Sequence, residues 1–104
     1  MGSNSLKNPP ALPDDARVLM ITPIDHRHVV TGATRHFVGG ELLTGVRALA
    51  IAQYDEADSF YLFYCSGDWL VLTDTLHGSV AAAQAQAEFE FQGTLQTWQP
   101  APVL

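Results

Sequence analysis

The sequence predicts an α+β domain, with an antiparallel sheet of four to six strands and one C-terminal helix packed on one face. Three apolar segments, at 46–54, 60–65 and 69–73, lie close together and alternate as strands do. The connections between them are short, which favours an antiparallel meander, because parallel crossovers need about a dozen residues or more. The segment 80–91 is rich in alanine and glutamine and predicts the helix.

The first half of the chain supplies the remaining strands. Residues 17–22 form a β-rich run that stops at Pro23, which is typical of an edge strand. Residues 34–38 predict a further short strand, and Gly39-Gly40 after it predict a turn.

A single domain is expected from the length of 104 residues. The proline-rich residues 1–16 predict a disordered leader, the domain then spans 17–98, and 99–104 form a C-terminal tail. The chain has one cysteine, which excludes an intramolecular disulfide and suits a reducing compartment. No apolar run is long enough to span a bilayer. We therefore expect a soluble, cytoplasmic protein of bacterial type.

The predicted strands are apolar on both faces. One helix covers only one face of a small sheet, so the other face must be closed by the N-terminal half of the chain, by a second copy, or by a ligand or partner. The alternation sets Leu49 and Ile51 against Ala48, Ala50 and Ala52, and it sets Phe60, Leu62 and Tyr64 against Tyr61, Phe63 and Cys65.

The helix has a predicted N-cap at Ser79. Its helical spacing places a stripe of mostly small side chains on one side, the side expected to dock on the sheet. This stripe consists of Val80, Ala83, Ala87 and Phe91.

Two acidic residues in the last turn, Glu88 and Glu90, break a local rule, because the helix dipole disfavours anions there. Such a conflict is expected where tertiary contacts compensate for it. We therefore expect at least one of the two to pair with Arg35 or Arg47 from the first half of the chain.

Charge is divided unevenly along the chain. Of five basic and eleven acidic residues, every basic residue precedes position 48, and the net charge is −6. Phosphate binding needs clustered cations, so nucleic acid and anionic membranes are excluded as expected partners. Two explanations stay open: arginines of the first half pair with acids of the second, or the acidic half faces a cationic partner.

Several stretches of the chain resemble a family of short bacterial proteins of unknown function. The resemblance covers about residues 36–98 and implies a strand meander followed by a helix, with no activity, cofactor or catalytic residue. The stretches are Phe37-Val38-Gly39-Gly40-Glu41, Ile51-Ala52-Gln53-Tyr54, Tyr61-Leu62-Phe63-Tyr64-Cys65, Asp68-Trp69, Leu72-Thr73-Asp74-Thr75 with His77, and Gln86-Ala87-Glu88-Phe89-Glu90-Phe91 ending at Trp98.

Three histidines are weak candidates for a metal site. His26 and His28 would share one face of a strand, and His36 could add the third nitrogen of a zinc site. The spacing is loose and no cysteine accompanies them, so a polar loop with solvated histidines is the alternative reading, and no metal or cofactor is expected.

Cys65, Asp74 and His77 are weak candidates for a nucleophile, an orienting acid and a base. The sequence places no cation near the thiol to lower its pKa, and a buried cysteine that acts as a small apolar residue is the commoner case. No catalytic residue is therefore assigned.

The preferred function is a non-enzymatic interaction domain that forms a homodimer or binds a protein partner, for example as an immunity-type inhibitor. Trp69, Tyr61 and Phe89 are the candidate contact residues, although aromatic residues of this kind are equally ordinary in a core. The alternative is a small-molecule binder or minor enzyme, with a pocket between the N-terminal strands and the helix that contains His26, His28, Cys65 or His77.

Overall fold

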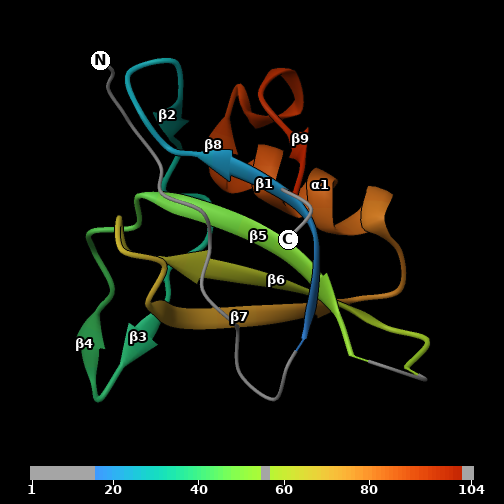
Figure 1. Ribbon diagram of the computed structural model, residues 1–104. Coiled ribbons are helices and arrows are strands. Elements are labelled where there is room, and N and C mark those ends of the chain that lie inside the picture. The colour runs from blue at the N-terminus through green and yellow to red at the C-terminus, as the bar shows by residue number, and fades with distance from the viewer. Residues whose placement is uncertain (1–15, 55–56, 102–104) are drawn as a thin grey trace.

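The computed structural model describes residues 16–54 and 57–101, and it has a five-stranded antiparallel sheet with one α-helix packed on it (Figure 1). The strand order is β7-β6-β5-β1-β9, and β5, β6 and β7 form a meander, so the predicted fold class is confirmed. The elements of this layer are β1 (Arg17–Pro23), β5 (Ala48–Gln53), β6 (Phe60–Cys65), β7 (Val71–His77), β9 (Gln99–Pro100) and α1 (Val80–Glu90).

The two ends of the domain differ from the expectation. The predicted tail contributes β9, which pairs with β1 through Ile21 opposite Gln99 and Met20 opposite Pro100. At the other end Ala16 is buried in the core, whereas the rest of the predicted leader lies outside the described residues.

The third meander strand is longer than predicted, because β7 continues to His77 instead of ending at Asp74. Its polar residues are tolerated because β7 is an edge strand, where one side of the backbone and many side chains face solvent. The turn before it is also longer: Ser66 N–H donates to the Leu70 carbonyl at 2.9 Å, and Trp69 adopts a left-handed backbone with φ of 65°.

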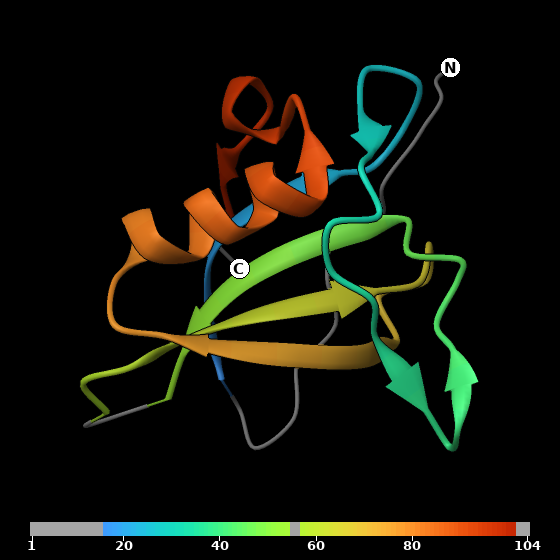
Figure 2. The ribbon, with the colours of Figure 1, turned by 180° about the vertical axis from the view of Figure 1, so that it is seen from behind.

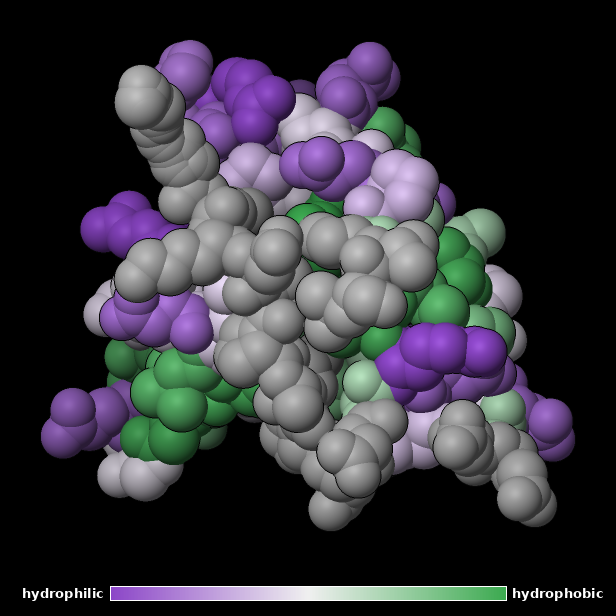
Figure 3. Space-filling view, in the orientation of Figure 1, coloured by the Kyte–Doolittle hydropathy of each residue, from purple (hydrophilic) through white to green (hydrophobic). Residues whose placement is uncertain are grey.

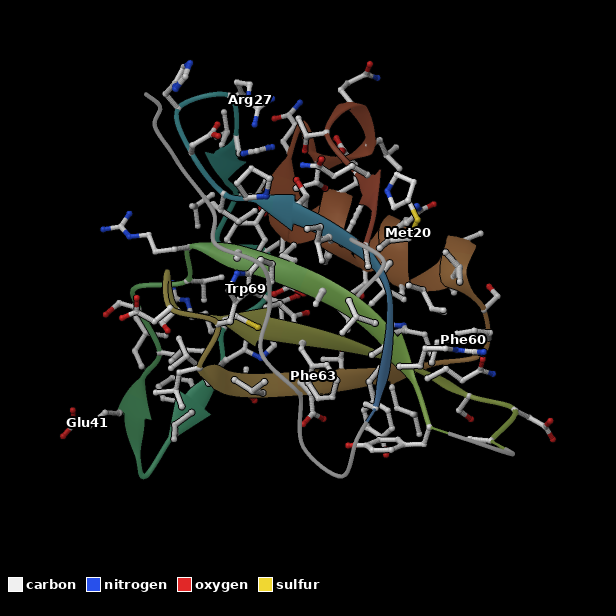
Figure 4. The ribbon with its side chains drawn as sticks, in the orientation of Figure 1. Met20, Arg27, Glu41, Phe60, Phe63 and Trp69 are labelled. Atoms are coloured by element: carbon white, nitrogen blue, oxygen red, sulfur yellow. The ribbon has the colours of Figure 1, made fainter. Side chains whose placement is uncertain are left out.

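Each face of the sheet carries its own apolar cluster, as the alternation predicts. On the face under α1, Leu49 and Ile51 pack with Ala83 and Ala87 of the helix. Of the predicted helix stripe, Ala83, Ala87 and Phe91 are buried and Val80 is partly buried. On the second face, small residues of β5 lie opposite larger residues of β6, and Figure 4 shows Phe63 and Trp69 on this side. The opposed pairs are Ala48–Cys65, Ala50–Phe63 and Ala52–Tyr61.

The segment between β1 and β5 forms two small sheets rather than strands of the main sheet. Strand β2 (Val29–Val30) pairs with β8 (Phe91–Gln92) at the end of the helix, and β3 (Phe37–Val38) pairs with β4 (Glu41–Leu42) as a hairpin. The turn of the hairpin is Gly39-Gly40 as predicted, and both residues have a positive φ, which glycine adopts without strain. Figure 2 shows this segment running from the helix past one end of the sheet.

Helix α1 is capped at both ends, by the side chain of Ser79 at its start and by the backbone N–H of Phe91 at its end. Ser79 is the N-cap, and its Oγ accepts a hydrogen bond from Ala82 N–H at 3.0 Å, as predicted. A short 3₁₀ helix, η2 (Thr94–Gln96), follows α1 after Gly93. Across residues 16–54 and 57–101, neither helix is long and apolar enough to cross a membrane.

Candidate functional site: a buried carboxylate beside a pocket

A pocket of about 390 Å³ lies where the segment from β2 to β4 passes the end of the sheet and the C-terminal end of α1. None of His26, His28, Cys65 and His77, the residues expected in a pocket between the N-terminal strands and the helix, lines it. Its volume falls within the range of natural ligand sites, about 300–1,000 Å³. Its apolar walls are Val30, Leu42, Leu43, Val46 and Phe91.

Glu90, in the last turn of α1, places a buried carboxylate in this wall. Its residue is 3% exposed, and three donors converge on it. Tyr64 donates its hydroxyl hydrogen to Oε2, Gln86 Nε2–H donates to Oε2 at 2.8 Å, and His36 Nε2 lies 2.7 Å from Oε1. Since an ionised carboxylate only accepts, this arrangement satisfies the charge without an arginine.

Tyr64 connects this carboxylate to the sheet. It lies on β6 and is fully buried. Burial, and then the hydrogen bond to Glu90, hold the pKa of Tyr64 well above its ordinary value. The hydroxyl also lies 3.4 Å from Thr75 Oγ1, which is 2.7 Å from His77 Nε2, so a line of polar groups crosses the helix-facing side of the sheet.

His36 is held over the pocket by the loop that carries it. Its carbonyl accepts from Leu43 N–H at 2.7 Å, and its ring centre is 4.6 Å from that of Tyr64. The loop is tied to the end of α1, because Thr31 donates its backbone N–H to the Glu90 carbonyl at 3.0 Å and its hydroxyl to the Phe89 carbonyl at 2.7 Å. These bonds satisfy helix carbonyls that otherwise lack a partner.

The expected pairing of the two last-turn acids with arginine is wrong for both residues in the described part of the chain. Glu90 bonds to His36 instead, and Glu88 accepts backbone hydrogens from Gly93 and Leu95 at 3.0–3.1 Å. As expected, both acidic residues of the last turn have tertiary contacts that compensate for the unfavourable helix dipole. The partners of Glu90 differ from the expected arginine: they are His36, whose side chain is partly exposed, and the buried Tyr64.

The three candidate metal ligands are not brought together. His36 is bound to Glu90, His26 is exposed, and the side chain of His28 is fully buried elsewhere. Asp25 N–H donates to His28 Nδ1 at 3.0 Å, so Nε2 carries the hydrogen and donates to Thr97 Oγ1 at 2.9 Å. Burial lowers the pKa of His28, consistent with this neutral tautomer. Within 16–54 and 57–101, no group of three or more acidic, histidine or cysteine side chains could hold a metal ion.

The candidate catalytic residues are also separated. Cys65 and Asp74 belong to the second face, whereas His77 bonds to Thr75 on the helix-facing side. Cys65 pairs with Val71, six residues along β7 from His77, so the two are about 20 Å apart. Burial raises the pKa of the Cys65 thiol to about 12, so it is not a nucleophile near neutral pH.

The three candidate contact residues have different environments. Trp69 is 2% exposed and belongs to the core of the second face, so it offers no surface to a partner. Tyr61 stacks on Phe63 with ring centres 5.6 Å apart. Only Phe89 is open, with 57% of the residue exposed.

No family model matches this chain, and no curated protein and no solved structure matches it. The geometry of the pocket is therefore the main indication of function.

Proposed function

We propose that the protein binds a small organic ligand in the pocket between the β2–β4 segment and the end of α1. The observation that carries the proposal is the joint presence of a cavity with apolar walls and of a few fixed polar groups, His36, Tyr64 and Glu90, at one side of it. Natural small-molecule sites combine these features, because apolar walls supply affinity and a few polar groups fix the orientation.

Two further features favour binding over turnover. The Glu90 carboxylate is already hydrogen-bonded to His36, Tyr64 and Gln86, and the single thiol of the chain lies on the other face of the sheet. We place this binding protein in a reducing compartment such as the cytoplasm, because its one cysteine is a free, buried thiol.

The test is a screen of a small fragment library by ¹H–¹⁵N NMR. We expect at least one fragment to shift amide signals saturably, with the shifted residues confined to the pocket, including His36, Thr44 and Val46. The substitution Thr44→Trp should fill the pocket and abolish the shifts, whereas Gln96→Trp, an exposed site on η2, should leave them intact. Shifts that lie outside the pocket, or that survive Thr44→Trp, would contradict the proposal.

A second candidate function, self-association, is favoured by a separate observation. Large apolar side chains are exposed along the segment from β2 to β4, and Figure 3 shows a hydrophobic area over the β3–β4 hairpin. The occupant we propose is a second copy. The hairpin region carries one cation, Arg35, and one anion, Glu41, so two copies can meet there without the repulsion that a net charge of −6 imposes elsewhere. The exposed residues are Val29, Val30, Phe37, Val38 and Leu42.

Light scattering tests this second candidate. We expect a dimer that Phe37→Ser converts to a monomer, while Phe89→Ser, an equally exposed phenylalanine on α1, does not. A wild-type monomer at high concentration would exclude self-association. The second face of the sheet is not the proposed interface, since its residues are already buried in the chain, Ala50 and Phe63 among them.

A further inference from the structure

We infer that the ligand of this pocket is an organic anion, with an apolar body and a carboxylate or a similar acidic group that Arg35 and Arg47 bind. The inference rests on the proposed function, because it assumes that the pocket is a ligand site. It adds the charge and the chemical class of the ligand and names the residues that recognise it.

The arginines of the described residues differ in whether they have a partner. Arg27 pairs with Asp25 at 2.9 Å, and Arg17 donates to Gln53 at 3.2 Å. In contrast, no ion pair or side-chain hydrogen bond joins Arg35 or Arg47 to another residue of 16–54 or 57–101. These two arginines both line the pocket.

Two arginines without a partner in the described ranges are unexpected in a protein with an excess of acidic residues. The protein has a net charge of −6, and acidic residues outnumber basic ones by eleven to five. Two arginines without an acidic partner at one cavity therefore form a local positive region on an acidic molecule. Guanidinium groups bind carboxylates through paired N–H donors, and an anion that enters the cavity would meet both.

Glu90 is the one acidic residue among the described residues that line the pocket. Its carboxylate is buried and accepts from Tyr64, Gln86 and His36, so it is stabilised by its own donors and does not need the arginines. The arginines thus stay available to a ligand at the mouth of the pocket. The apolar residues Leu43 and Val46 would contact the uncharged body of that ligand.

The backbone of Arg47 is fixed in a way that suits recognition. Its N–H donates to the Cys65 carbonyl and its own carbonyl accepts from Ile24 N–H, both at 2.8 Å. The side chain therefore starts from a rigid point at the beginning of β5, which lowers the conformational entropy lost on binding.

The experiment compares octanoate with octanamide, which has the same apolar chain and no charge, by NMR titration at neutral pH. We expect octanoate to bind more tightly and to weaken as salt increases. Arg35→Gln and Arg47→Gln should each lower octanoate affinity roughly three- to tenfold, since a partly exposed guanidinium–carboxylate contact is worth about that much. Octanamide affinity should not change in these variants.

The control is Arg17→Gln, which removes the same charge from β1, outside the pocket, and should leave octanoate affinity unchanged. If both compounds shift the pocket amides equally and neither arginine substitution discriminates between them, the pocket binds ligands but the anion inference is overturned. If neither compound shifts any pocket amide in the wild-type protein while a library fragment does, the anion inference alone fails; if no fragment does either, the proposed pocket function fails with it.

Discussion

The two faces of the sheet use their buried residues differently, and the neighbours Tyr64 and Cys65 on β6 show the contrast. Cys65 points into the second face, a cluster of alanine, aromatic and aliphatic side chains. Tyr64 points toward the helix, where its hydroxyl meets Glu90 beside the pocket. Both residues are fully buried, but only Tyr64 has a hydrogen bond to an acidic side chain.

This contrast indicates which side of the sheet is the better candidate for a functional site. A buried polar group destabilises the folded state unless it has a hydrogen-bond partner. A purely apolar face has no such requirement and is the simpler source of stability. The second face of the sheet is apolar in this way. The helix-facing side accepts a buried carboxylate, a tyrosine and a histidine at the edge of a cavity, an arrangement that stability alone does not require.

The largest expected effect tests the second face as a source of stability. Phe63→Ala removes a ring that is 2% exposed and should lower the free energy of unfolding by about 3–5 kcal/mol, from lost apolar burial and the remaining cavity. Urea denaturation measures it. The matched variant Phe89→Ala, at a largely exposed ring, should change stability by less than about 0.5 kcal/mol. Equal losses of stability in the two variants would contradict the assignment of Phe63 to the core and of Phe89 to the surface.

The main sheet and the helix were predictable because local periodicity and burial agree in them. Alternation placed Leu49 and Ile51 on one face and their alanine neighbours on the other, and the small-residue stripe of α1 fits against them as expected. The ends of strands were less predictable. Strand β7 continues through Asp74 because an edge strand can expose a carboxylate, and nothing in the local pattern distinguishes that from a loop.

The residues of the candidate site were not predictable from the sequence. A pocket between the N-terminal strands and the helix was expected, with His26, His28, Cys65 or His77 in it, yet it is lined by His36, Tyr64 and Glu90. The link between His36 and Glu90 spans 54 residues, a separation that no local spacing rule reports. The one usable signal was Glu90 itself, an anion at the wrong end of a helix.

A smaller effect tests the polar side of the comparison. Glu90→Ala leaves the donors of Tyr64, Gln86 and His36 without their acceptor and should cost about 2 kcal/mol of stability. The matched variant Glu88→Ala removes a partly exposed carboxylate that accepts only backbone hydrogens, and should cost about 1 kcal/mol or less. Urea denaturation again provides the values. An unchanged stability in Glu90→Ala would show that water replaces the carboxylate and that the network is not a fixed part of the pocket.

The smallest effect concerns Cys65 and reports how dry the second face is. Burial raises the pKa of this thiol from 9.0 to about 12, so below pH 9 both the folded and the unfolded chain keep the proton and the stability is complete. As the pH rises from 9 toward 12, the unfolded chain loses the proton first, binds fewer protons than the folded chain, and becomes relatively more stable. The wild type should therefore lose about 1 kcal/mol more than Cys65→Ala between pH 8 and pH 10 in urea titrations. Tyr64 is present in both variants, so its own raised pKa cancels from this difference. Parallel losses in the two proteins would mean that water reaches the thiol, and the second face would then be as hydrated as the pocket side.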